Sequence, residues 1–442
     1  MKRRREYRTA LPAVGHVSAS GSVAYLCWSG IDWYIWVTAL SALAFNNFSP
    51  TISAAIFIAA AILYLSLKPI KALRSAFNGF TPWYYVLLAL ISILWSQQAE
   101  LTARYMIEFA VTTGVALLIA RSLSPTAFMS ALLVALLIVD VSSLVDPRKA
   151  WNTGGLAMIG VFGSKNAFSE AHGILFLTAW WVLLRNGQSP FVRVLALFGV
   201  SISPLLLIAG RSADAMFSAA VAGGISFLAG RLRWASRLGR VIATLMAASI
   251  AISSILIIYP FLDEIRGQVL NLSGKDITLS GRTYLWQRAG ELINQNPLLG
   301  TGFGAFWVRG NAYAEELWAH FGLSGRGGYN FHNMWYEATV QLGYPGLIMA
   351  ALTVAVVSIE VIRWFVRSPN AESCFFLAYV LFIDMRTVLE VELFSQFSYT
   401  WVVFIAAWAY ARDSRGFGLT WSSDTKRRSG MLANHPPLNL ET

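Results

Sequence analysis

The sequence has little charge and little cysteine for its length. Only 13% of its 442 residues are charged and 56% are hydrophobic, whereas an average soluble domain carries about 25% charged residues. This shortage excludes a water-soluble enzyme and a disordered chain. The presence of only two cysteines excludes a secreted disulfide scaffold. With a mean hydropathy of +0.55, the composition indicates a membrane protein that crosses the bilayer many times.

The cysteines and the net charge exclude further kinds of site. Cys27 and Cys374 both lie in apolar stretches, so we expect no disulfide between them, and two isolated cysteines do not make a zinc site. A net charge of +11 would suggest nucleic acid in a soluble protein. Here the basic residues are placed between apolar runs, so we expect the lipid bilayer as a partner and no nucleic acid.

Apolar runs long enough to cross a bilayer, which takes about 20 residues, recur along the chain. With the N-terminus in the cytoplasm, 22 of the 34 Lys and Arg fall in cytoplasmic segments, as the positive-inside rule requires. The predicted fold class is therefore all-α, a polytopic membrane helix bundle with both termini cytoplasmic. Twelve spans are predicted, of which the third and fourth are short or polar: 23–45, 51–67, 81–95, 102–120, 126–145, 167–184, 191–209, 213–230, 240–259, 344–362, 373–391 and 393–411.

This topology divides the chain into a basic tail (1–22), nine spans (23–259), a large periplasmic loop (260–343), three spans (344–411) and a tail expected to be disordered (412–442). The loop carries six Lys or Arg although it lies on the outer side, which suggests an anionic ligand. Within it, apolar residues follow a helical period over 282–293, and a second amphipathic stretch, 332–342, leads into the tenth span.

Three basic features are candidates for chemistry. Arg211 lies between two spans joined by almost no loop, where a guanidinium can grip a phosphate; the alternative is an ion pair with Asp214. His332 follows the loop and can act as a general base near neutral pH, or it is structural. The loop 146–166 combines glycines with Arg148, Lys149 and Lys165, which favours an anion, but a plain solvated loop has the same composition.

Other motifs are weaker. The GTGFG at 300–304 lacks the strand–helix context of a dinucleotide site. Glu390 and Glu392 form an E-x-E, but on a helix the two point to different faces, and Glu390 is expected to pair with Arg386 four residues earlier. Arg104 and Glu108 have the same spacing, and both pairs are interpreted as structural. Without a D-x-D motif, a metal-dependent sugar-nucleotide enzyme is disfavoured.

Five stretches together resemble the O-antigen ligase and polymerase superfamily of inner-membrane proteins. They are SILWSQQAELT, GVFGSKN, AGRSADAM, SGKDITLSGRTYLWQRAGELINQNPLLGTGFGAFW and NFHNMWYEATVQLGYPGL. The resemblance covers most of the chain, because it includes the order of these stretches, about twelve spans, and one large loop before the last three spans. The amino-acid sequence of the loop is most similar to those of the ExoQ-type exopolysaccharide polymerases.

The resemblance implies a GT-C-like membrane glycosyltransferase that needs no metal and no cofactor. Its donor would be a glycan on undecaprenyl diphosphate, and its acceptor a second glycan or lipid A core. The family motifs place the catalytic residues at Arg211, Arg282 and His332. As substrate-binding residues we expect Lys165, Arg148, Arg288, Asn333 and Glu337. A chain-length regulator protein would be a further partner.

On this interpretation the arginines stabilise the diphosphate leaving group, His332 activates the acceptor hydroxyl, and a single displacement inverts the anomeric carbon. Three alternatives stay open. A ligase would transfer the finished polymer to lipid A core by the same chemistry. A polysaccharide or small-molecule transporter could also use twelve spans, although its polar groups would lie at the bilayer midplane. A scaffold protein would need neither His332 nor Arg211.

Overall fold

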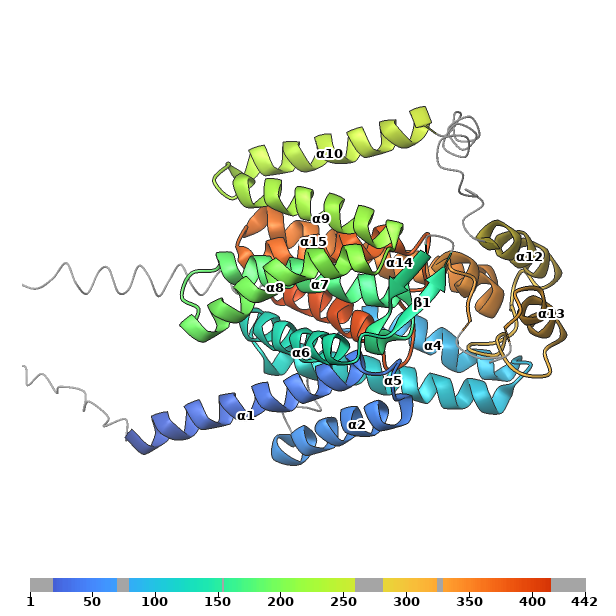
Figure 1. The fold of residues 1–442 in the computed structure, drawn as a ribbon, viewed down its shortest axis with the longest axis horizontal. Helices are drawn as coiled ribbons and strands as arrows, with labels where there is room; N and C mark the ends of the chain where they lie inside the picture. Colours follow the sequence, from blue (N-terminus) through green and yellow to red (C-terminus); the bar gives the residue numbers. More distant parts are fainter. Residues whose placement is uncertain (1–18, 70–78, 153–154, 259–280, 324–328, 415–442) are drawn as a thin grey trace, which may run out of the picture.

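The computed structural model describes residues 19–69, 79–152, 155–258, 281–323 and 329–414. Nearly all of its elements are helices, and most run along the long axis of the view in Figure 1. Two shorter helices, α12 (Arg282–Gln295) and α13 (Ala312–His320), cover one end of this bundle. We refer to that end as the loop end. The chain is a polytopic membrane helix bundle, as its composition predicts.

Within the described residues, seven helices are long and apolar enough to cross a membrane. They are α2 (Pro50–Leu67), α5 (Ala99–Ser122), α6 (Pro125–Val145), α7 (Lys165–Leu184), α8 (Pro190–Ala209), α9 (Ala213–Leu232) and α14 (Met334–Arg367). The remaining predicted spans coincide with α1 (Ala19–Ala44), α10 (Arg237–Ile258), α15 (Ala371–Arg386), a last helix over 399–414 and the short apolar segment Thr81–Leu94, whose central helix is α4 (Tyr84–Ile91).

The helices begin where the sequence supplies a cap. Ser124 lies directly before α6 and Ser189 directly before α8, and each side chain accepts a hydrogen bond from a backbone N–H in the first turn of its helix. Each serine is followed by a proline at the first helical position. Asn370 forms a capping box at the start of α15. These caps satisfy part of the first turn, whose N–H groups would otherwise have no partner in lipid.

Two predicted limits are wrong. The eleventh span was expected to run to residue 391, but α15 ends at Arg386, and the twelfth helix begins at 399 and not at 393. The residues between, 387–398, form turns and bends. We call them the irregular segment. Six of these twelve residues are apolar and are interspersed among polar ones, so the predicted spans ran into the segment from both sides.

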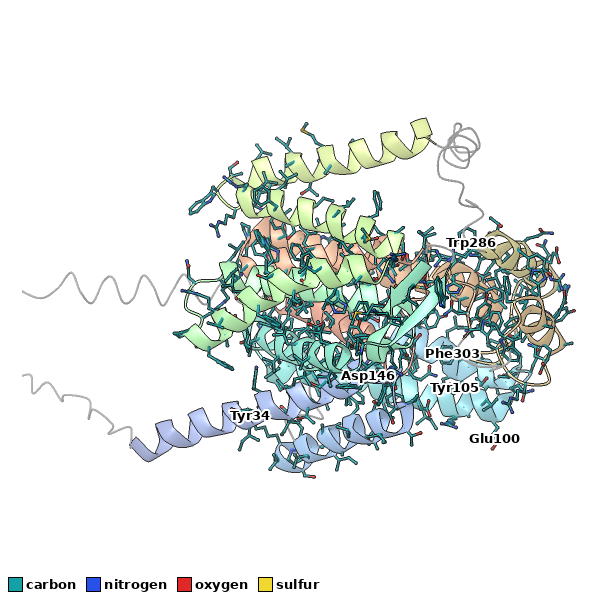
Figure 2. All side chains as sticks on the ribbon, viewed as in Figure 1. Tyr34, Glu100, Tyr105, Asp146, Trp286 and Phe303 are labelled. Atoms are coloured by element: carbon teal, nitrogen blue, oxygen red, sulfur yellow. The ribbon has the colours of Figure 1, made fainter. Side chains whose placement is uncertain are left out.

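The loop end has a hydrophobic core of its own. Leu285, Ala289 and Ile293 of α12 are buried against Leu317 and Trp318 of α13, which confirms the helical face predicted over 282–293. Figure 2 shows Trp286 and Phe303 at this end, with Tyr105 of α5 beside Phe303. The apolar stripe of α12 therefore packs within the loop.

A turn at Gly300–Gly304 fastens the loop to the bundle. Backbone N–H groups of Thr301 and Gly302 donate to the carbonyls of Val340 and Gln341 on α14, at 3.0 and 2.8 Å. On the other side the hydroxyl of Ser92 accepts from the N–H of Phe303 at 3.2 Å. The stretch SILWSQQAELT, singled out in the sequence, thus anchors the loop.

The long helix α14 is interrupted just after this contact. Leu342 and Gly343 leave the helical conformation, and Gly343 has a φ of 63°. A side chain at Gly343 would collide with the backbone of Leu298. The kink therefore separates the amphipathic start of α14, predicted over 332–342, from the apolar part that follows.

The segment between α6 and α7 contains a small hairpin that the sequence did not predict. Strands β1 (Lys149–Asn152) and β2 (Gly155–Met158) pair antiparallel. The hairpin lies beside α7 and α8 (Figure 1). Cys374 in α15 is a free, buried thiol, while the side chain of Cys27 lies outside the described part of the chain.

Candidate active site

One carboxylate joins three distant parts of the chain. Glu390, on the irregular segment, is 8% exposed. Its Oε1 accepts from Nδ2 of Asn166 at 2.5 Å and forms an ion pair with Arg282. Its Oε2 lies 3.0 Å from Nδ1 of His332. The starts of α7, α12 and α14 therefore meet at Glu390.

His332 is held in a conformation that fits a positioned base. Because the Glu390 carboxylate accepts, Nδ1 of His332 carries the hydrogen in this arrangement, and in the neutral ring Nε2 then has the lone pair. The N–H of His332 donates to Oδ1 of Asn330 at 2.7 Å. The side chain is 26% exposed and lines a cavity.

Asn333 fixes the backbone directly after His332. It is the N-cap of α14, and its Oδ1 accepts from the N–H groups of Trp335 and Tyr336 at 2.9 and 3.1 Å. Its Nδ2 donates to the carbonyl of Val388 at 2.9 Å. Asn333 was expected to bind substrate; its observed contacts attach α14 to the irregular segment.

Glu337, the other residue expected from the same motif, lies one turn further along α14. Its carboxylate accepts from Nε1 of Trp307 at 3.1 Å, from the N–H of Phe331 at 3.0 Å and from Nε2 of Gln341 at 2.7 Å. It also lines the smaller of two cavities at this end. These bonds hold the backbone before His332 against the loop.

The larger cavity has a volume of about 890 Å³ and lies where α7, α15 and the irregular segment meet the loop. His332, Glu390, Arg386, Glu392 and Glu170 are among the residues that line it. A cavity of this size lies in the range that holds small molecules. Its charged lining suits a ligand with both ionic and hydroxyl groups.

Behind this cavity lies a buried ion cluster centred on Arg386, which is 1% exposed. Its guanidinium donates to Glu392 at 2.6 Å and to Asp214 at 2.7 Å, and it lies 3.9 Å from Glu170. The predicted pairing of Arg386 with Glu390 is therefore wrong: the helix stops at Arg386, which turns the two side chains to different partners. The Arg104–Glu108 pair, by contrast, is confirmed at 2.9 Å.

Arg211 lies at the same end but outside both cavities as the described residues define them. Its side chain is exposed and passes beside Gly155 of β2, where a Cβ would lie 2.7 Å from the guanidinium. Its neighbour Ser212 donates to Oδ1 of Asn166 at 3.1 Å, which places Arg211 one residue from the Glu390 network. Asp214, the alternative partner of Arg211, forms an ion pair with Arg386 at 2.7 Å.

The other basic candidates take different positions. Lys165 is the first residue of α7, directly before Asn166. Arg288 pairs with Glu291 and, at 2.7 Å, with Glu316. Arg148 lies 4.8 Å from the ring centre of Phe48 and 3.4 Å from Asp146. Of the side chains predicted as site residues, therefore, only those of His332 and Arg282 are seen to contact Glu390 in the described part of the chain.

Backbone strain is concentrated at the same place. Among the described residues, four that are not glycine have a positive φ: Arg211, His332, Phe394 and Phe397, with values from 48 to 63°. Such conformations cost roughly 1–3 kcal/mol each and cluster at functional sites. Two of the four, Arg211 and His332, are among the three residues that the sequence predicted to be catalytic, and the other two lie in the irregular segment.

Two comparisons with known proteins found a match. A protein-family profile described as O-antigen ligase matches residues 195–351, a range that begins in α8 and includes Arg211, Arg282 and His332. The chain is also 29% identical over 324 residues to the exopolysaccharide production protein ExoQ of Rhizobium meliloti (strain 1021), covering 71% of this chain and 72% of that protein. Both matches support a relationship with the O-antigen ligase and polymerase superfamily. The chain is a membrane enzyme of the glycosyltransferase type.

The superfamily motifs gain a physical role from the structure. GVFGSKN supplies Ser164, the N-cap of α7, and Asn166, which binds Glu390. AGRSADAM supplies Ser212 and Asp214, which bind Asn166 and Arg386. Sequence reasoning did not identify Glu390 or Asn166 as site residues. The position of Asn166 next to Lys165 in a motif was the one available signal.

Tyr329 lines both cavities. Burial raises the pKa of Tyr329 to about 12, and the positive charge of Arg282 opposes the rise only in part. The phenol therefore stays neutral at any working pH and can donate a hydrogen bond to a ligand oxygen.

Proposed function

We propose that the enzyme polymerises oligosaccharide repeat units carried on undecaprenyl diphosphate, at the periplasmic face of the bacterial inner membrane. The observation that supports this best is the placement of His332 and Arg282 on the single carboxylate of Glu390, beside the larger cavity. It brings a candidate base that lines this cavity and a candidate diphosphate ligand to one carboxylate. The name of the ExoQ relative, an exopolysaccharide production protein, favours polymerisation.

In the proposed reaction the acceptor hydroxyl oxygen attacks the anomeric carbon of the donor glycan. The bond from that carbon to the diphosphate oxygen breaks, and undecaprenyl diphosphate leaves with the electron pair. The hydroxyl proton passes to Nε2 of His332, whose lone pair is free because Nδ1 donates to Glu390. One displacement of this kind inverts the anomeric carbon.

Negative charge on the leaving diphosphate calls for fixed donors. Arg282 gives one N–H to Glu390, and a guanidinium has five N–H donors in all, so further donors remain for phosphate oxygens. Arg211 and Lys165, near the same network, add positive charge within reach of a long diphosphate group. We propose that these side chains serve without a metal, and that both chain termini lie in the cytoplasm.

The test uses purified protein in detergent or nanodiscs, with lipid-linked repeat units, EDTA and no lipid A core. We expect a ladder of products from the wild type. His332→Asn, which retains the left-handed backbone more easily than alanine, should give none. Absence of a ladder from folded wild-type protein, or a product with retained anomeric configuration, would contradict the polymerase or the single displacement.

The second candidate is an O-antigen ligase, favoured by the description of the matching profile. Its donor would be a finished polymer on undecaprenyl diphosphate and its acceptor lipid A core. Adding lipid A core to the same assay separates the two, because a ligase converts the core in a single step and builds no ladder from repeat units alone. A chain-length regulator protein, added to the assay, should narrow the ladder of a polymerase.

A further inference from the structure

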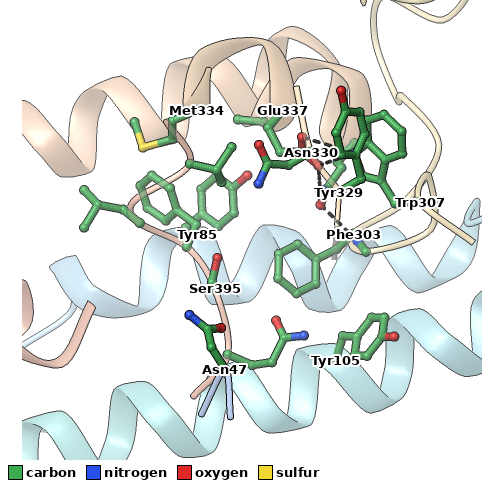
Figure 3. Close-up of a pocket in the computed structure, with 17 residues that line it drawn as sticks. Asn47, Tyr85, Tyr105, Phe303, Trp307, Tyr329, Asn330, Met334, Glu337 and Ser395 are labelled. Atoms are coloured by element: carbon green, nitrogen blue, oxygen red, sulfur yellow. Dashed lines mark hydrogen bonds between the residues drawn. The ribbon is translucent and has the colours of Figure 1, made fainter. Parts of the chain in front are cut away.

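A second cavity adjoins the larger one and differs from it in chemistry. It has a volume of about 400 Å³ and is lined by residues of α4, α5, α14, the loop and the irregular segment. Figure 3 shows Tyr85, Tyr105, Phe303, Trp307 and Tyr329 around it. We call it the aromatic pocket. Among the described residues that line it there is no Lys, Arg or His.

The absence of cations from this lining restricts the ligand. The one charged lining group, the Glu337 carboxylate, already accepts from Trp307, Phe331 and Gln341. A diphosphate would therefore meet no positive charge in the pocket. A neutral group would meet no such obstacle.

Several polar groups that line the pocket form no hydrogen bond within the described chain, and a ligand could provide their partners. Within the described chain, the side-chain amides of Asn47 and Gln396 and the hydroxyls of Tyr85 and Ser395 form no hydrogen bond, and all four residues line the pocket. Amides and hydroxyls both donate and accept. They match the mixed donor and acceptor pattern of sugar hydroxyls.

The aromatic walls are rigid. Phe303 packs 5.6 Å from Phe109 and 6.3 Å from Tyr85, measured between ring centres. Trp307 lies edge-on to Tyr329 at 5.2 Å, and its Nε1 donates to Glu337. Rings held in this way offer apolar faces without losing side-chain entropy when a ligand binds.

The two cavities meet at shared residues. Tyr329 and Asn330 line both, and so do Ser395 and Gln396 of the irregular segment. Asn330 also accepts from the N–H of His332. A ligand in the aromatic pocket would therefore end beside the histidine that lines the charged cavity.

We propose that the aromatic pocket binds an uncharged stretch of glycan, whose sugar faces lie against Phe303 and Trp307 and whose hydroxyls bond to Asn47 and Gln396. This inference rests on the proposed function for the source of the glycan, which is either the acceptor chain or the sugar end of the donor. It assigns the sugars to one pocket and the diphosphate to the other.

The first experiment measures binding without turnover. The probe is the oligosaccharide released by mild acid from the lipid-linked repeat units of the bacterium that carries the gene. Its Kd is measured by calorimetry with the His332→Asn protein, with and without the added pair Asn47→Ala and Gln396→Ala. The matched control is Asn186→Ala, at the opposite end of α7, where the side chain is exposed.

We expect the paired change to weaken binding by about tenfold, since it removes at least two hydrogen bonds, and the control to leave Kd unchanged. Thermal unfolding temperatures of both variants should match that of the parent protein. An oligosaccharide that does not bind the parent at millimolar concentration, or that binds the paired variant equally well, would overturn the inference. If the paired change weakens binding but the wild-type protein forms no ladder in the polymerisation assay, only the proposed function would be contradicted.

A second measurement identifies the source of the glycan. In the protein with His332 intact, the lipid-linked donor and a fluorescent short-chain acceptor are varied in turn. If the pocket holds the acceptor, the paired variant raises the KM of the acceptor alone. If it holds the donor sugars, the KM of the donor rises alone. No change in either KM would overturn the inference.

Discussion

Nδ1 of His332 lies 3.0 Å from Oε2 of Glu390, although 58 residues separate them in the chain. The contact fixes which ring nitrogen carries the hydrogen in a side chain that lines the larger cavity. The same carboxylate of Glu390 also binds Arg282 and Asn166. A change at any of these four side chains therefore alters the setting of the histidine.

Replacing His332 with asparagine should abolish turnover while keeping the fold. General base catalysis contributes about 10²- to 10⁴-fold, so we expect the rate of product formation to fall by at least about 10²-fold. Asparagine tolerates the observed φ of 48°. The rate is measured from gel ladders over time, with the unfolding temperature as the control. A variant that retains more than a tenth of the rate would argue against a base.

Glu390→Gln should slow the reaction without weakening substrate binding. The amide keeps the size of the side chain but loses the charge that holds Arg282 and His332. We expect kcat to fall roughly 10- to 100-fold, as when the group that orients a metal-bound histidine is lost, with KM nearly unchanged. Glu291→Gln is the matched control, because Glu291 pairs with Arg288 on the surface of α12. An equal fall in kcat in the two variants would show that the loss of activity does not depend on the contacts of Glu390.

Arg282 and Arg288 lie on one helix and provide an internal comparison. Arg282→Lys keeps the positive charge but loses the guanidinium fork, so we expect at least about a tenfold fall in kcat. Arg288→Lys should change the rate by no more than about twofold, because exposed ion pairs contribute little. Both are measured with the lipid-linked donor at saturating concentration. A larger loss of rate in Arg288→Lys would support the substrate-binding role that the sequence predicts for Arg288.

The turn that anchors the loop can be tested at two glycines with similar backbones. Gly302 has a φ of 101°, and a Cβ there would lie 2.5 Å from that of Ser96. Gly310 has a φ of 87° with no atom within 4 Å of an added Cβ. Gly310→Ala should cost only the backbone strain, about 1–2 kcal/mol. Gly302→Ala adds overpacking of about 1–3 kcal/mol.

The comparison is made by thermal unfolding in detergent, together with the polymerisation rate. We expect Gly302→Ala to have the lower unfolding temperature and the lower rate, because its turn joins the loop to α14 next to the kink. Equal unfolding temperatures would mean that the contact with Ser96 relaxes without cost.

Much of the bundle follows from the sequence. Each predicted apolar run coincides with a helix, and the periodicity of 282–293 predicted both α12 and its buried face. Local signals were sufficient because a span needs little more than length and apolar composition. They failed where apolar residues continue at intervals but the chain leaves the helix, as it does after Arg386.

The site was predicted only in part, for a related reason. His332 and Arg282 stand in motifs that can be read locally. Glu390 was assigned to a helix and to Arg386, because a spacing of four residues is a signal for a pair only if the helix continues. The partners that Glu390 does bind lie 58, 108 and 224 residues away. No spacing rule reaches over such separations.

The irregular segment also bears on how such an enzyme can change its substrate in evolution. The same short stretch supplies Glu390 to the charged cavity and Gln396 to the aromatic pocket. A substitution there that suits a new sugar also disturbs the backbone that positions the reacting groups. The wall contributed by Tyr105 of α5 carries no such linkage. Homologues that act on different glycans should therefore differ on that wall while keeping residues 387–398 nearly the same.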